Sequence, residues 1–154
     1  MEIKRATIDD FDQIKGIKLA AKASERRYNK SLKPIQQTRE KYFSYLRNDL
    51  SDEDRAVFIA MDRDKPVGII AGRIHTTLPI KLLPRKGHIS NLFVVPSHRK
   101  KGLASRLLKE LLDWFKEKEI EDVRLGVHAR NASALNMFRK LKFKEYAIEM
   151  KKSL

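Results

Sequence analysis

Apolar residues follow two different spacings along the chain, and each spacing indicates a different kind of element. Within residues 103–115 they recur every three or four positions, with charged residues between them. This spacing places the apolar side chains on one face, which is typical of an amphipathic helix. The same spacing predicts three further helices, over residues 10–21, 38–46 and 131–141.

Shorter apolar runs, bounded by Pro, Gly and charged residues, predict strands. Six such runs occur, at residues 2–6, 56–61, 66–74, 88–95, 123–127 and 144–150. Between the second and third runs, residues 62–65 (DRDK) have the composition of a hairpin turn, so these two strands should pair antiparallel. Residues 49–55 and 75–87 are expected to form loops.

The order of these elements predicts the class of fold. After an initial strand come two helices and three strands, and then helix, strand, helix, strand. A strand, a helix and a second strand in succession favour a right-handed parallel crossover. We therefore predict one α/β domain over residues 1–154. Its mixed sheet should be antiparallel in the N-terminal part, with a parallel central pair, and be flanked by about four helices.

The charge of the chain narrows the classes of partner. Its 154 residues contain 34 Lys and Arg against 20 Asp and Glu, a formal net charge of +14, and no Cys. The lack of Cys excludes disulfides, a cysteine nucleophile and thiolate metal sites. No apolar run approaches the roughly 20 residues that span a bilayer, and the first residues lack the apolar stretch of a signal peptide. We therefore expect a cytoplasmic protein with no membrane partner. The positive charge by itself does not choose among nucleic acid, an anionic membrane face and an acidic small ligand.

The segment most informative about chemistry links the strand at residues 88–95 to the helix at residues 103–115. It carries Arg99, Lys100 and Lys101 and then a glycine, Gly102. The first amides of a helix lack intrahelical acceptors and lie at the positive end of the helix dipole, so this turn suits an anion such as a phosphate. An ordinary solvated basic loop is the alternative interpretation. The glycine spacing of a Walker loop or of a Rossmann fingerprint is missing.

Two motifs in this order resemble those of the GNAT superfamily of acetyl-CoA-dependent N-acetyltransferases. The first is [QR]-x-x-G-x-[GA], matched by Arg99, Gly102 and Ala104 after a strand that ends at Pro96. The second motif includes a downstream Asn and aromatic residues. Its matching residues are Leu125, Val127, Asn131, Ala134, Phe138 and Phe143. With the matching order of elements, the resemblance extends over essentially the whole chain and implies a GNAT-like mixed sheet.

The resemblance implies that acetyl-CoA is the cosubstrate, with its pyrophosphate on the amides of the turn and its amide-bearing arm paired with the strand before it. A main-chain N–H near Leu92 or Phe93 would polarise the thioester carbonyl. The full set of coenzyme-binding residues implied in this way is Leu92, Phe93, Val94, Val95, Arg99, Lys100, Lys101, Gly102, Leu103, Ala104, Ser105, Asn131 and Phe138.

The sequence differs from the family's pattern at the positions whose side chains would donate or accept a proton in the reaction. Phe138 stands where the family often has a Tyr that protonates the departing thiolate, and Tyr146 or Ser133 are possible substitutes. The central strand carries no carboxylate that could act as the base. The candidate catalytic residues are His88, Ser90 and Tyr28, with His75 and His128 behind them, although an unremarkable surface role is an alternative for each. No spacing of His or carboxylates suggests a metal site.

These observations predict an acyltransferase that moves an acetyl group to a primary amine of a small molecule or protein, by direct attack in a ternary complex. The resemblance places the acceptor site at residues 24–34 and 75–87, which are basic and have Lys22 nearby. This favours an acceptor with an acidic group, or an amine of a protein or of a nucleic-acid-associated molecule, over a polycation. Two alternatives stay open: a nucleic-acid-binding basic domain, and a catalytically inactive GNAT fold that senses acyl-CoA. Because residues 142–154 provide for one further strand only, a homodimer that covers the sheet edge is also compatible with the sequence.

Overall fold

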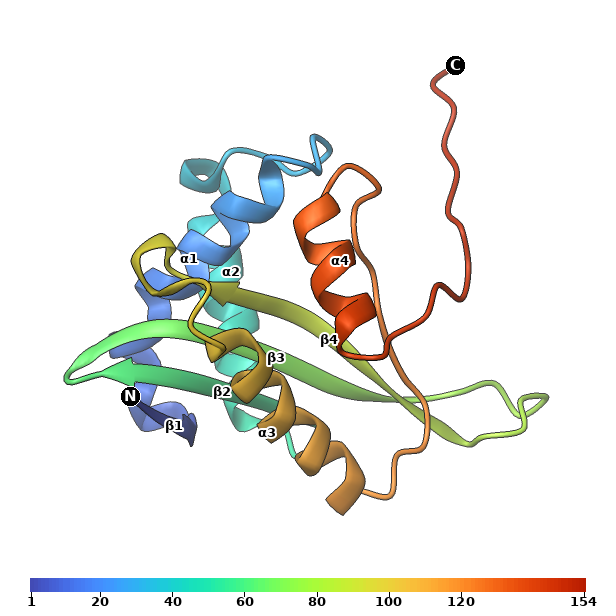
Figure 1. Ribbon diagram of the computed structural model, residues 1–154, viewed down its shortest axis with the longest axis horizontal. Coiled ribbons are helices and arrows are strands. Elements are labelled where there is room, and N and C mark those ends of the chain that lie inside the picture. Colours follow the sequence, from blue (N-terminus) through green and yellow to red (C-terminus); the bar gives the residue numbers. More distant parts are fainter.

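A five-stranded sheet with helices on both faces forms the body of the protein, as described by a computed structural model of residues 1–154 (Figure 1). The strands are β1 (Glu2–Arg5), β2 (Arg55–Asp62), β3 (Lys65–Thr76), β4 (Arg85–Val94) and β5 (Val123–Leu125). The helices are α1 (Phe11–Arg26), α2 (Ile35–Ser51), α3 (Leu103–Glu117) and α4 (Ala132–Lys140). Two short 3-10 turns, Ile8–Asp10 and Pro96–His98, precede α1 and α3. None of these helices contains an apolar stretch that would span a bilayer.

The strands lie in chain order, β1-β2-β3-β4-β5. The first three pairs are antiparallel and the β4–β5 pair is parallel, which confirms the predicted mixed sheet. The β2–β3 hairpin turns at Arg63, whose φ of 55° is the left-handed conformation that a tight two-residue turn requires. The parallel pair is joined through α3, as expected for a strand-helix-strand crossover.

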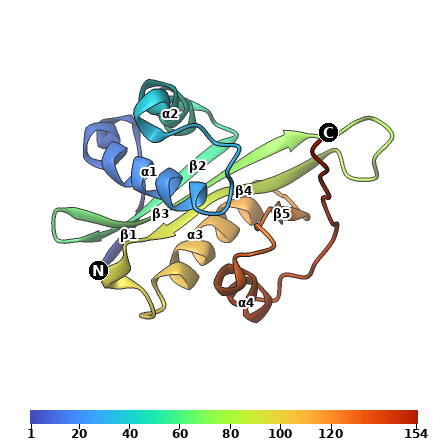
Figure 2. The same cartoon turned by 90° about the horizontal axis from the view of Figure 1, so that it is seen from above.

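Two apolar layers hold the helices to the sheet (Figure 2). On one face α3 contributes Leu107, Leu111 and Phe115, and on the other α1 and α2 contribute Ile14 and Leu46. The amphipathic pattern that predicts α3 is therefore the pattern of its buried face. Burying apolar area on both faces is the main stabilising contribution to such a sheet.

Close approach of α3 to the sheet depends on glycine. A Cβ atom on Gly87 of β4 would lie 2.6 Å from Cε1 of Phe115, and one on Gly68 of β3 would lie 2.8 Å from Cδ1 of Leu107. Neither distance is compatible with an ordinary van der Waals contact. These glycines thus set how closely α3, and the turn that leads into it, lies against β4.

The ladder between β3 and β4 is interrupted by a β-bulge in the middle of β4. Ile89 lies opposite Gly72 and Asn91 lies opposite Ala71, which leaves Ser90 without a partner in β3. On its other edge β4 pairs with β5 only from Gly87 to Ile89. The second half of β4 therefore has β3 on one edge and no strand on the other.

The strand predicted for residues 144–150 is wrong. These residues form no strand and make no backbone hydrogen bond to the sheet, and the chain leaves the body there (Figure 1). Tyr146, Ile148 and Met150 are largely exposed. The physical reason is that β5 has only three residues in the ladder, which gives a further strand little to pair with.

Other elements begin or end at residues different from those predicted. The second helix begins after Pro34 rather than at Thr38, because Pro lacks an N–H and suits a helix start, and the Thr38 hydroxyl donates to the Pro34 carbonyl from within the first turn. That helix ends at Ser51, inside the predicted 49–55 loop. The predicted 75–87 loop is shortened to residues 77–84, because β3 and β4 extend into it and Thr77 N–H donates to the Pro84 carbonyl.

Candidate functional site

The turn between β4 and α3 presents six consecutive amides that donate to no acceptor in the protein, those of residues 100–105. The first helical bond of α3 runs from Arg106 N–H to the Gly102 carbonyl, at 3.1 Å. Lys100 has a φ of 59° and Gly102 a φ of 75°, so the chain reverses direction within the turn. A run of free amides at a helix N-terminus, concave and positively polarised, is suited to bind an anion.

Side chains hold this turn in place. Arg99 Nε donates to the Val94 carbonyl at 2.8 Å, and Lys101 Nζ donates to the Ser97 carbonyl at 3.3 Å. His98 Nε2 lies 2.9 Å from the Asp62 carboxylate, and this hydrogen bond lowers the pKa of Asp62 below its ordinary value. Arg99 and Lys101, two of the three residues expected to surround an anion with charge, thus also fix the backbone, while Lys100 is exposed.

The free edge of β4 leads directly into that turn. Val95 N–H donates to the Val67 carbonyl in β3, at 2.9 Å. Because residues alternate in an antiparallel ladder, Phe93 also faces β3, whereas the peptide groups of Leu92 and Val94 face the edge without a strand. The edge therefore offers backbone donors and acceptors to a ligand that extends along it.

The last helix, α4, is capped by Asn131. Its Oδ1 accepts from Ala134 N–H at 3.1 Å, so the predicted helix cap is confirmed, and its Nδ2 has no acceptor in the protein. Phe138 is the buried residue of α4, packed edge-to-face against Phe143 with ring centroids 5.5 Å apart. The other two residues predicted for the inner face, Leu135 and Leu141, are only half-buried.

Four of the five candidate catalytic residues lie in two aromatic pairs, and the fifth, Ser90, is the bulge residue of β4. The rings of His75 and His88 are 6.0 Å apart, and His88 lies opposite Arg73 in the ladder. Burial, followed by the charge of Arg73, lowers the pKa of both histidines, so both are neutral near pH 7. Tyr28, between α1 and α2, lies beside His128, which follows β5, with ring centroids 6.0 Å apart.

The bulge residue Ser90 is exposed, and its hydroxyl is 3.4 Å from the Ala71 carbonyl. The two residues considered for protonating the thiolate lie apart from each other. Tyr146 stacks on the Arg124 guanidinium at 4.1 Å, and Arg124 lies opposite His88 in the β4–β5 pair. Ser133 is exposed in the first turn of α4.

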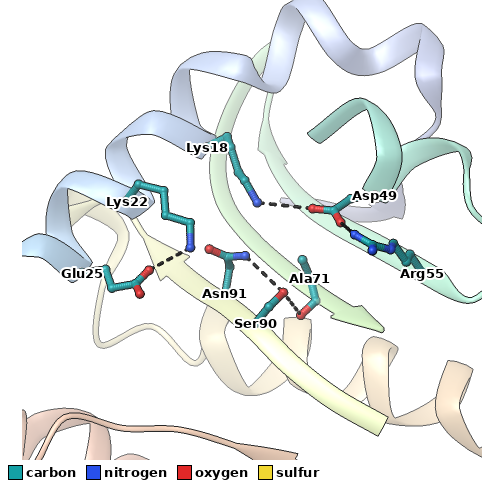
Figure 3. Close-up of polar contacts among 8 residues, drawn as sticks. All are labelled: Lys18, Lys22, Glu25, Asp49, Arg55, Ala71, Ser90 and Asn91. Atoms are coloured by element: carbon teal, nitrogen blue, oxygen red, sulfur yellow. Dashed lines mark hydrogen bonds and ion pairs between the residues drawn. The ribbon is translucent and has the colours of Figure 1, made fainter. Parts of the chain in front are cut away.

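Two lysines of α1 lie near this part of β4. The sequence pointed to Lys22, as one of the basic residues near the acceptor loops, but not to Lys18. Lys18 and Lys22 extend from α1 toward β4, above Ser90 and Asn91 (Figure 3). Lys18 is buried, and burial lowers its pKa although Asp49 lies 3.4 Å from its Nζ. The available signal was that Lys18 falls on the apolar face of the predicted helix, where a charged residue requires a partner.

Known proteins resemble this chain in sequence and in fold. The acetyltransferase (GNAT) family matches residues 21–143. N-alpha-acetyltransferases from Sulfurisphaera tokodaii and Saccharolobus solfataricus are 30% and 29% identical over 151 residues, covering 95% of this chain and 81% of each relative. The crystal structure of a predicted acetyltransferase with acetyl-CoA from Clostridium acetobutylicum is 18% identical. Its TM-score is 0.78, over 99% of this chain and 95% of that chain.

The chain therefore belongs to the acetyltransferase (GNAT) family, as its two motifs predicted. It is an enzyme, an N-acetyltransferase. Its sheet and four helices have the GNAT arrangement.

Proposed function

We propose that this protein transfers an acetyl group from acetyl-CoA to the α-amine of a peptide or protein. The observation that carries the proposal is the row of six free amides at residues 100–105, one 3-10 turn beyond the unpaired edge of β4. The chain thus provides a strand edge with free backbone groups and, after the turn, an anion site.

The chemistry of acetyl-CoA fits this surface. A pyrophosphate accepts hydrogen bonds from several converging amides, and the nearby lysines add positive charge. The amides of the coenzyme arm are matched by the outward peptide group of Leu92 and by the outward N–H of Val94, whose carbonyl accepts from Arg99. Asn131 Nδ2 is a free donor on the facing side, and Phe138 supplies an apolar wall for the sulfur.

In the proposed reaction the amine nitrogen of the acceptor bonds to the acetyl carbon, and the bond from that carbon to sulfur breaks. The outward N–H of Leu92 stabilises the negative charge on the carbonyl oxygen. One proton leaves the amine, and the neutral imidazole of His88 is the group that accepts it. The sulfur leaves as a thiolate, because Phe138 has no proton to donate.

The α-amine is the acceptor best suited to a basic site without a carboxylate base. An α-amine has a pKa of about 8, against about 10.4 for a lysine side chain, so far more of it is neutral near pH 7.5. The relatives named N-alpha-acetyltransferase cover most of this chain, which supports the same acceptor.

The test is release of coenzyme thiol from acetyl-CoA over three acceptors. The first is a peptide with a free N-terminus and no lysine, the second has a blocked N-terminus and one lysine, and the third is the polyamine spermidine. The proposal predicts turnover of the first peptide, with the acetyl group on its α-nitrogen by mass spectrometry. Turnover of only the lysine peptide or spermidine, or no turnover although acetyl-CoA binds, would overturn it.

A further inference from the structure

The loop between β3 and β4, residues 77–84, carries large apolar side chains that contact little of the protein. The exposed fractions of Leu78, Ile80 and Leu82 are 65%, 84% and 100%. The loop lies at the tip of a long hairpin that projects from the body, away from the turn that precedes α3 (Figure 1, Figure 2). Single exposed apolar residues are common on proteins, whereas three gathered at one projecting tip indicate a surface that binds a partner.

Hydrogen bonds hold this loop in a defined shape. Its base is closed by Thr77, whose N–H donates to the Pro84 carbonyl at 2.9 Å and whose hydroxyl donates to the Leu83 carbonyl. At the tip, Lys81 N–H donates to the Leu78 carbonyl at 2.9 Å. Two prolines restrict the backbone further. The apolar side chains are therefore displayed on a loop that is already formed, so binding requires little further ordering of the chain.

The charged residues of this hairpin are all cations. They are Arg73, Lys81, Arg85 and Lys86. No Asp or Glu occurs from residue 65 to residue 109, and none of the four cations takes part in an ion pair. Asp122 interacts with the charge of Lys86 at longer range, but it is paired with Arg124 at 2.9 Å. The partner of this surface should therefore be both apolar and anionic.

A lipid bilayer with anionic headgroups matches both properties. The phosphates of a nucleic acid would match the cations but would leave the apolar side chains in water. A protein groove that buried the apolar side chains would also bury the ammonium of Lys81, which lies between Ile80 and Leu82 in the sequence, and this is unfavourable. At a lipid surface, a lysine beside apolar residues extends its ammonium to the headgroups while the apolar residues enter the acyl region.

We propose that the β3–β4 loop attaches this protein to the surface of an anionic bilayer, with Leu78, Ile80 and Leu82 inserted among the acyl chains. The sequence led us to expect no membrane partner because no apolar run is long enough to span a bilayer, and attachment by a loop requires no such run. The free amides at residues 100–105 follow the other end of β4, whose ten residues span roughly 30 Å, so the coenzyme turn stays in water.

The test is cosedimentation with vesicles of phosphatidylcholine alone and of phosphatidylcholine mixed with phosphatidylserine, at constant ionic strength. We expect the partition coefficient to be at least about tenfold higher for the mixed vesicles, because several cations would lie near the anionic headgroups. Leu78→Ser/Ile80→Ser/Leu82→Ser should lower binding to the mixed vesicles at least about tenfold, because it removes the side chains that insert.

The C-terminal segment provides the matched control. Ile148→Ser/Met150→Ser/Leu154→Ser also removes three largely exposed apolar side chains, beside Lys151 and Lys152, and should bind mixed vesicles within about twofold of the unaltered protein. Both triple variants should keep the affinity for coenzyme A of the unaltered protein, which shows that they are folded. Equal losses of vesicle binding in the two variants would overturn the inference.

A fluorescent label measures insertion directly, because the chain has no Cys and a single introduced one is labelled uniquely. The emission of an environment-sensitive dye on Leu82→Cys should shift to shorter wavelength with mixed vesicles, and that of the same dye on Ile148→Cys should not. No shift at position 82, or no binding of the unaltered protein to mixed vesicles, would overturn the inference. Self-association through the tip in the absence of lipid would assign the tip to a second copy and would also overturn it. None of these results depends on the acceptor of the enzyme.

Discussion

Arg99 Nε donates a hydrogen bond to the carbonyl oxygen of Val94, at 2.8 Å, and so closes the end of β4 where the strand passes into the turn. The Val94 carbonyl faces the edge without a strand, so this bond satisfies an acceptor that no other part of the chain reaches. The anion site is thus formed by the backbone, and Arg99 acts by holding that backbone in shape.

Replacement of Arg99 tests this role. Arg99→Ala removes the bond to Val94 and loosens the turn before a ligand binds, so we expect the affinity for coenzyme A to fall about tenfold. Lys109→Ala removes a charge elsewhere on α3 and should leave the affinity within about twofold. Isothermal titration calorimetry at constant ionic strength measures both. An equal loss in the two variants would mean that net charge, rather than turn geometry, determines binding.

Two glycines should respond in opposite directions to replacement by alanine. Gly102 has a φ of 75°, so Gly102→Ala should lower the free energy of unfolding by about 1–2 kcal/mol. Gly16 lies within α1 at an ordinary φ, so Gly16→Ala should raise it by roughly 0.5–1 kcal/mol. A Cβ at either position has no atom within 4 Å, so steric clash does not contribute. Urea unfolding of both variants gives the sign, and a loss of stability in both would contradict the backbone argument.

The packing of α3 on the sheet gives a separate prediction. Gly87→Ala places a Cβ 2.6 Å from the Phe115 ring and should cost about 1–3 kcal/mol of stability. Combining it with Phe115→Leu should recover part of the loss, because the smaller side chain makes room, whereas Gly126→Ala, with open space around it, is the neutral control. Losses that simply add in the double variant would contradict a direct contact between the two residues.

The sequence predicts features that depend on residues close together in the chain, and misses features that depend on contacts between distant segments. The buried face of α3 and the R-x-x-G-x-A turn are determined by residues close together in the sequence. The turn that was predicted to bind an anion is the one whose amides are free. The bulge at Ser90 depends on register with β3, and the shared carboxylate of Asp49 depends on contacts between α1, α2 and β2. Such long-range pairings leave no periodic signal, which is why the partners of Lys18 could not be predicted from the sequence.

The failure at residues 144–150 has a related cause. Alternating Tyr146, Ile148 and Met150 have the spacing of a strand, but a strand forms only where a neighbouring edge provides donors and acceptors. The β5 ladder ends at Leu125 and provides three residues. Local pattern therefore predicted an element that the rest of the sheet does not support.

The free energy of unfolding should fall when the solution is acidified, because His75 and His88 are harder to protonate in the folded protein than in the unfolded chain. Burial and the charges of Arg73 and Lys86 hold both pKa values below the unfolded value of about 6.5. The unfolded state therefore takes up more protons, so the contribution is present above about pH 6.5 and is lost as the pH falls toward the folded pKa values. The free energy of unfolding should drop less between pH 7.5 and 5.5 in His75→Gln/His88→Gln than in the unaltered protein.

Arg73→Gln should show a pH dependence of stability between that of the unaltered protein and that of the double histidine variant. It removes one positive charge that disfavours protonation of both histidines, so the drop in stability between the two pH values should be reduced but not abolished. Denaturant unfolding at the two pH values measures all three proteins. The same drop in every variant would show that other groups control the acid response.

The central claim is that the backbone from Leu92 to Ser105 forms the coenzyme site, and amide chemical shifts on addition of coenzyme A to isotope-labelled protein test it most directly. The account predicts that the largest shifts fall on the amides of residues 100–105 and on those of Leu92 and Val94, with Gly16 and Lys109 unaffected. Shifts that spread over the basic surface, or that leave residues 100–105 unchanged at saturating coenzyme, would contradict it.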